Sequence, residues 1–124
     1  MEIIISNSSG RPIYEQITDQ VKSQIMNGQL KPGEMLPSMR ALAADLKISL
    51  ITTKRAYNDL EAEGFIETVA GKGTYVAQQD PELLREANLR LAEGHLGKAV
   101  EVARRGGIGK EELCQMIEIL YEDD

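Results

Sequence analysis

Aromatic and cysteine residues are scarce in this 124-residue sequence. Tryptophan is absent and phenylalanine occurs once, so aliphatic side chains must form most of any core. The single cysteine, Cys114, excludes an internal disulfide and favours a cytoplasmic protein. No run approaches the roughly 18 apolar residues of a membrane span, and the first residues lack the pattern of a secretion signal.

Motifs for metal binding and catalysis are also missing. The one histidine, His95, has no cysteine or acidic cluster at metal-ligand spacing, so we expect neither a metal nor a cofactor. There is no pattern of a nucleophile with its base, and the glycines around Lys72 are too few for a phosphate-binding loop. We therefore expect that the protein is not an enzyme.

The net charge of −6 by itself argues against binding to nucleic acid, but the charge is unevenly distributed. Residues 1–79 carry 8 basic and 9 acidic side chains, whereas residues 80–124 carry 6 and 11. The acid is concentrated in the C-terminal part. Overall charge limits nonspecific affinity more than it excludes site-specific binding, so the first part remains compatible with DNA.

Three helices are expected in the first part. Pro12 suits a first helical position, apolar residues recur every four positions from Ile13 to Ile25, and Gly28 ends that helix. Ser38 and Ser49 are candidate N-caps of the second and third helices. The inward face of the third helix is expected to contain Thr53, Ala56, Tyr57 and Leu60.

Short strands and further helices complete the pattern. Residues 65–69 and 74–77 are rich in β-branched and aromatic side chains and flank a glycine-containing turn, which predicts a hairpin. Residues 3–5 are a third candidate strand. A helix should start at Asp80. Gly94 and Gly97 weaken this helix, so we consider a kink or a break at these glycines. A last helix should start near Lys110.

Three helices followed by a hairpin are the order of a winged helix-turn-helix, in which the third helix enters the DNA major groove. The expected fold class is thus α+β, mainly α. We expect a winged helix-turn-helix DNA-binding domain at residues 1–79 and a short C-terminal helical dimerisation segment at residues 80–124.

Five segments in register resemble the GntR family of bacterial regulators: Pro12–Ile17, Gly28 with Leu30–Gly33, Leu36–Ala43, Leu60–Phe65 and Gly71–Val76. The remaining residues are too few for the large effector domains of most GntR branches. The short two-helix tail resembles the YtrA subfamily, whose members dimerise through it. The resemblance implies a repressor, often of a transport operon, that binds double-stranded DNA as a homodimer.

The DNA contacts that this resemblance implies fall on Arg40 of the second helix, on Ser49, Thr52 and Lys54 of the third, and on Gly71 and Lys72 at the wing tip. Two positions depart from the family, which commonly has Arg or Asn where Leu50 stands and Arg where Ala70 stands.

Leu50 and Ile51 occupy the first turn of the third helix, and we expect them to contact thymine methyl groups. The alternative for Leu50 is packing back onto the second helix. The charged residues Arg40 and Lys72 have a simpler interpretation as solvated surface, and Ser49 has a simpler interpretation as a helix cap alone.

The competing function is that of a winged helix that binds protein and has lost DNA binding. The patterns do not identify an operator, a regulated gene or a small-molecule effector.

Overall fold

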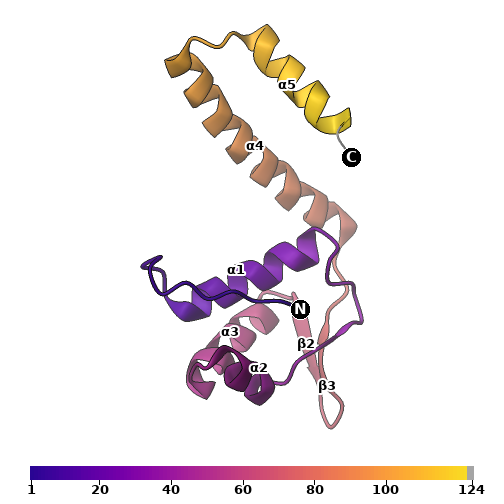
Figure 1. Cartoon of the computed structure of the whole chain (residues 1–124). Coiled ribbons are helices and arrows are strands. Elements are labelled where there is room, and N and C mark those ends of the chain that lie inside the picture. Colours follow the sequence, from indigo (N-terminus) through magenta and orange to yellow (C-terminus); the bar gives the residue numbers. More distant parts are fainter. Residues whose placement is uncertain (123–124) are drawn as a thin grey trace. The chain divides into compact units, whose positions relative to one another are not determined.

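The computed structural model describes residues 1–122, and the chain divides into two compact units, residues 1–84 and 85–124. The first unit contains α1 (Ile13–Met26), β1 (Met35–Leu36), α2 (Met39–Leu46), α3 (Leu50–Ala62), β2 (Ile66–Val69) and β3 (Gly73–Val76). α4 (Pro81–Gly106) starts in the first unit and forms most of the second, together with α5 (Lys110–Glu122) (Figure 1). The expected α+β, mainly α winged-helix fold is confirmed.

The core of the first unit lies between α1, α2, α3 and the sheet. The inward positions expected for α3 are confirmed, since Thr53, Ala56, Tyr57 and Leu60 are all buried. Ile17, Val21 and Ile25 of α1 are also buried, as the four-residue recurrence predicts. The Tyr57 hydroxyl donates a 2.7 Å hydrogen bond to the carbonyl oxygen of Pro37, and burial raises the pKa of Tyr57 to about 12.

A three-stranded antiparallel sheet in the order β1-β3-β2 closes the core. The hairpin of β2 and β3 is confirmed, with Ile66 opposite Val76 and Val69 opposite Gly73. β1 was not expected from the sequence. It pairs Met35 with Tyr75 and Leu36 with Thr74, and only its pairing with β3 defines it, because two residues are too few to show an alternating pattern.

The strand considered for residues 3–5 does not form. This segment instead runs beside α1, where side-chain amides take the place of a neighbouring strand. Gln20 accepts from the Ile4 N–H at 2.9 Å and donates to the Ile4 carbonyl oxygen at 2.7 Å. Gln16 bonds Ser6 in the same two ways, and Gln24 donates to the carbonyl oxygen of residue 2.

The Gln16–Gln24 spacing explains this arrangement. Amides four residues apart on a helix are about 6 Å apart along its axis, and alternate residues of an extended chain are separated by about 6.6 Å. The helix spacing and the strand spacing match closely enough for three glutamines, each four residues from the next, to form hydrogen bonds with alternate residues of the segment. The side chain of Ile3 is buried in the core and anchors the segment.

α4 runs without interruption past Gly94 and Gly97, so the break considered at these glycines is absent (Figure 1). Each glycine costs only about 1 kcal/mol relative to alanine, and most neighbouring residues favour helix. α4 ends at Gly106, and the Ile108 N–H donates to the Ala103 carbonyl oxygen at 2.8 Å across Gly107. The start of α5 at Lys110 is confirmed.

The second unit covers few of its own apolar side chains. Ala103 is the only buried residue in α4, and α5 has none among its described residues. Large apolar side chains are exposed along both helices: Leu83, Leu89, Leu91, Leu96, Val100, Val102, Met116, Ile119, Leu120 and Tyr121. Within residues 1–122, neither these helices nor any other is long and apolar enough to cross a membrane.

Candidate nucleic-acid interface

The turn between α2 and α3 is tight and held by its own backbone. Lys47 ends α2 in the left-handed conformation with φ of 57°, which is uncommon for a residue with a side chain. The Ile48 N–H donates to the Ala43 carbonyl oxygen at 3.0 Å. This geometry closes α2 and lets α3 start at Leu50. The result is the compact turn that the sequence predicts for a helix-turn-helix.

Both serine caps are confirmed. Ser38 Oγ accepts a hydrogen bond from the Ala41 N–H at 3.1 Å, and Ser49 Oγ accepts one from the Thr52 N–H at 3.1 Å. Ser49 also donates to Thr52 Oγ1 at 2.8 Å. Because the Ser49 proton is used within the turn, the Thr52 hydroxyl keeps its own proton for an outside acceptor such as a phosphate oxygen.

The outer face of the first turn of α3 is apolar at its centre. Ile51 is 82% exposed and Leu50 is 38% exposed. Neither is among the buried residues of the core cluster. Asn58, which the motif comparison did not single out, is exposed and lies seven residues after Ile51. Residues seven apart return to the same side of a helix, so this spacing could have identified Asn58 from the sequence.

All three expected cationic contacts are open to solvent. Arg40 of α2, Lys54 of α3 and Lys72 of the hairpin are exposed, and none of them joins an ion pair within residues 1–122. Because these side chains have no carboxylate partner there, no ion pair has to break when they bind a phosphate or a base edge.

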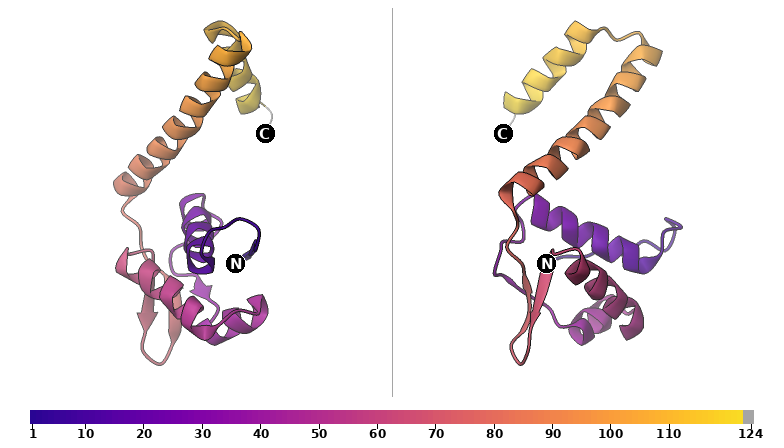
Figure 2. Two further views of the ribbon diagram at one scale, coloured as in Figure 1. Left: turned by 90° about the vertical axis from the view of Figure 1, so that its left-hand side faces the viewer. Right: turned by 180° about the vertical axis from the view of Figure 1, so that it is seen from behind.

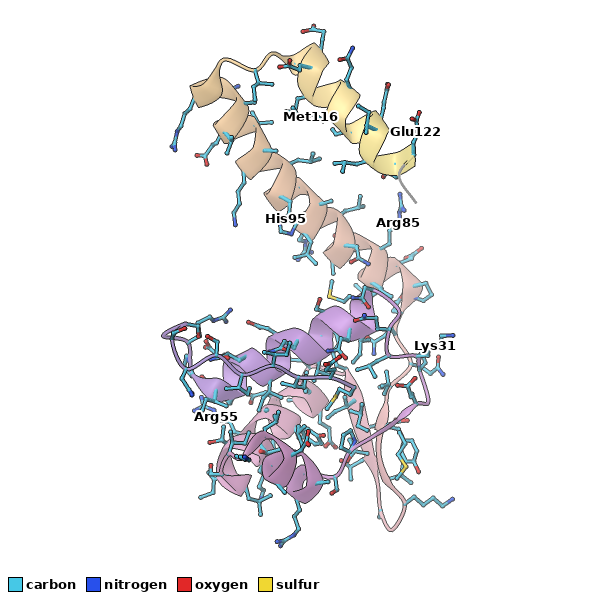
Figure 3. The ribbon with its side chains drawn as sticks, in the orientation of Figure 1. Lys31, Arg55, Arg85, His95, Met116 and Glu122 are labelled. Carbon is cyan, nitrogen blue, oxygen red and sulfur yellow. The ribbon has the colours of Figure 1, made fainter. Side chains whose placement is uncertain are left out.

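The neighbouring cation Arg55 is placed differently. Its guanidinium carbon lies 3.7 Å from the centroid of the Tyr14 ring, which belongs to α1. Figure 3 shows Arg55 at the N-terminal end of α1. This stacking holds Arg55 toward the protein and leaves Lys54 as the unengaged cation of the pair.

The wing tip is a tight turn between β2 and β3. The Lys72 N–H donates to the Val69 carbonyl oxygen at 2.9 Å, and Gly71 has φ of 76°. Gly73 has φ of 129°, and a Cβ there would lie 3.1 Å from Met35 Cε. Glycine is therefore favoured at this position by its conformation, and a larger residue would also require the flexible end of Met35 to shift.

The interface residues expected from the sequence come from three elements of the first unit. Arg40 lies on α2, and Ser49, Leu50, Ile51, Thr52 and Lys54 gather at the start of α3. Gly71 and Lys72 form the hairpin tip, which extends from the sheet at the end of the unit where α2 and α3 also lie (Figure 2). Among residues 1–122, no group of three histidine, cysteine or acidic side chains is arranged to hold a metal ion.

Comparison with known proteins identifies the family. The model described as bacterial regulatory proteins, gntR family, matches residues 13–76. The HTH-type transcriptional repressor YtrA of Bacillus subtilis (strain 168) is 36% identical over 121 residues, which cover 98% of this chain and 93% of that protein. The similarity thus extends through α4 and into α5, and the expected resemblance to the YtrA subfamily is confirmed.

Two solved structures of transcription regulators have a similar fold. YtrA from Sulfolobus acidocaldarius, a GntR-family transcription factor, aligns with a TM-score of 0.57 and 34% identity over 98% of this chain and 97% of its own. AraR(DBD) in complex with operator ORX1 aligns with a TM-score of 0.54 and 28% identity over 62% of this chain and 96% of its own. These relatives and the family are regulators of transcription and not enzymes. The chain is therefore a DNA-binding transcription regulator that belongs to the GntR family.

Proposed function

We propose that this regulator is a cytoplasmic repressor that binds an inverted-repeat operator as a homodimer. The curated relative that matches nearly the whole chain is a transcriptional repressor, and the AraR domain with the same fold is bound to an operator. The observation that carries the proposal is that Arg40 and Lys54, on the two helices of the helix-turn-helix, are exposed and form no ion pair within residues 1–122.

The proposed contacts divide by role. Arg40 and Lys54 have the chemistry to read base edges, chiefly guanine, or to bind phosphates. The Ser49 cap and the free proton of the Thr52 hydroxyl suit a phosphate at the start of α3. At the wing, the main chain at Gly71 can approach the DNA backbone closely because it carries no side chain, and Lys72 supplies charge.

Dimerisation is assigned to residues 80–124. The exposed apolar residues of α4 and α5 are too many and too large for an ordinary surface, and within residues 1–122 they remain between 38% and 81% exposed. A second copy supplies the same apolar surface, and two-fold dimers are the commonest oligomers. A two-fold dimer presents two copies of α3, which matches an inverted repeat with half-sites about one helical turn, or a small multiple of it, apart.

The test is a binding titration with a duplex that the full-length protein selects from a random-sequence pool. Arg40→Ala and Lys54→Ala should each weaken binding by about 1–3 kcal/mol if they read bases, which is roughly 5- to 150-fold. Lys31→Ala is the matched control, because Lys31 is exposed in the loop after α1 (Figure 3). Unchanged affinity in both test variants would remove these residues from the interface.

Salt dependence provides a second readout. Three cationic contacts per subunit with phosphates would give a slope of roughly −5 in a plot of log affinity against log salt.

A protein-binding module without DNA binding is the second candidate. It is favoured by the exposed Leu50 and Ile51 and by the net charge of −6. The same selection decides between the two functions, since a protein that enriches no duplex supports the protein-binding module.

Regulation of a transport operon is proposed on the resemblance to the YtrA subfamily, and identification of the genes beside the selected operator tests it.

A further inference from the structure

Ile51 is the most exposed large apolar residue of the first unit, at 82%. Its surroundings are polar: the Ser49–Thr52 hydroxyl pair precedes and follows it, and Lys54 is one turn away. Ile51 and its partly covered neighbour Leu50 together expose too small an apolar area for a protein-binding patch. An apolar side chain with polar neighbours instead suits the DNA major groove, where the C5-methyl group of a thymine is surrounded by polar base edges and phosphates.

The direction of the Ile51 side chain follows from the helix geometry. Successive residues are rotated by about 100°, so Ile51 points roughly 170° away from the mean direction of the four buried residues of α3. Asn58 shares that outward side, and Lys54 lies beside it. In a recognition helix, the outward side of the first turns is the part that meets base edges.

We propose that Ile51 contacts the C5-methyl group of a thymine in each half-site, and thereby selects an A·T pair at that position. The inference rests on the proposed operator binding and adds a specificity determinant to it. Leu50 is 38% exposed, so more than half of its surface is already covered by this chain, and the assignment is made for Ile51. The contact needs no hydrogen bond: it buries two apolar groups that would otherwise face water.

The test uses the full-length protein and the duplex that it selects from a random-sequence pool. Each thymine of the duplex is replaced in turn by uracil, which lacks only the C5-methyl group. Burial of one methyl group is worth about 0.8 kcal/mol, so one position per half-site should lose about fourfold in affinity when that half-site alone is changed. The same replacement should cost Ile51→Ala clearly less.

Ile4→Ala is the matched control, because it removes the same atoms from an isoleucine that is 72% exposed and lies in the segment beside α1. It should keep the uracil profile of the unmodified protein. A uracil scan without any loss, or a loss of equal size in Ile51→Ala, would overturn the methyl contact while leaving operator binding intact. A protein that selects no duplex would overturn operator binding and the methyl contact together.

Discussion

Tyr57 shows how one buried side chain positions α3 relative to the start of α2. Its hydroxyl bonds the Pro37 carbonyl oxygen just before α2, so this contact ties α3 to the start of α2. Tyr57→Phe removes the donor and leaves that carbonyl without its partner. We expect a loss of about 1–2 kcal/mol in the free energy of unfolding at neutral pH, measured by urea denaturation.

The raised pKa of Tyr57 adds a prediction for alkaline pH. Burial disfavours the phenolate and raises the folded-state pKa from 10.0 to about 12. The stability that the neutral phenol contributes is therefore complete below about pH 10 and is lost as the pH rises toward about 12. The unfolding free energy of the unmodified protein should fall more over this range than that of Tyr57→Phe. Equal losses in the two proteins would contradict the assignment.

At the scale of elements, the three-glutamine contact between residues 2–6 and α1 predicts a local effect. Gln20→Ala removes both bonds to Ile4, so the amide hydrogen of Ile4 should exchange with solvent markedly faster. The global unfolding free energy should fall by only about 1 kcal/mol, because these bonds are exposed. Gln78→Ala, an exposed glutamine outside this contact, is the control and should leave exchange at Ile4 unchanged.

The helix α4 offers a test of why its glycines do not break it. Nothing lies within 4 Å of where a Cβ at Gly94 or Gly97 would be. Alanine removes the entropic cost of glycine in a helix, so each substitution should raise stability by about 0.5–1 kcal/mol. Thermal denaturation followed by circular dichroism measures this. A marked loss instead would reveal that a partner helix approaches α4 closely at that glycine.

The assembly is the prediction at the scale of the whole molecule. The full chain should be a dimer in light scattering at tens of micromolar, whereas Leu120→Lys, which places a charge on a side chain that is 70% exposed, should be monomeric. A chain cut after Gln79 should be monomeric too. Ile4→Lys adds the same charge to an exposed isoleucine of the first unit and should remain a dimer. A monomeric full-length protein would refute the role of residues 80–124.

Operator binding should follow the assembly, because two linked recognition helices bind a two-part site far more tightly than one. Leu120→Lys should therefore lose most affinity for the selected duplex although its DNA-binding unit is unchanged. The circular dichroism spectrum must stay close to that of the unmodified protein for this comparison to hold.

The helices, the hairpin and the family could all be predicted from the amino-acid sequence. Helix positions follow from apolar spacing and from the caps at Ser38 and Ser49, which act within a few residues of themselves. The hairpin follows from β-branched residues around a glycine turn. Most candidate contacts came from matching motifs, because the order of residues along α2, α3 and the wing determines which element carries each side chain. Leu50 and Ile51 came instead from their place in the first turn of α3.

Features that depend on contact between distant segments of the chain could be found only in the folded structure. β1 exists because β3 lies beside it, and residues 3–5 stay extended without a strand partner because α1 offers its glutamines. Arg55 is held by Tyr14 of α1, which leaves Lys54 as the open cation, and no pattern within α3 shows this. The exposure of Ile51 is of the same kind. The physical reason is that periodicity gives the direction of a side chain, whereas its burial depends on whether another part of the chain lies in that direction.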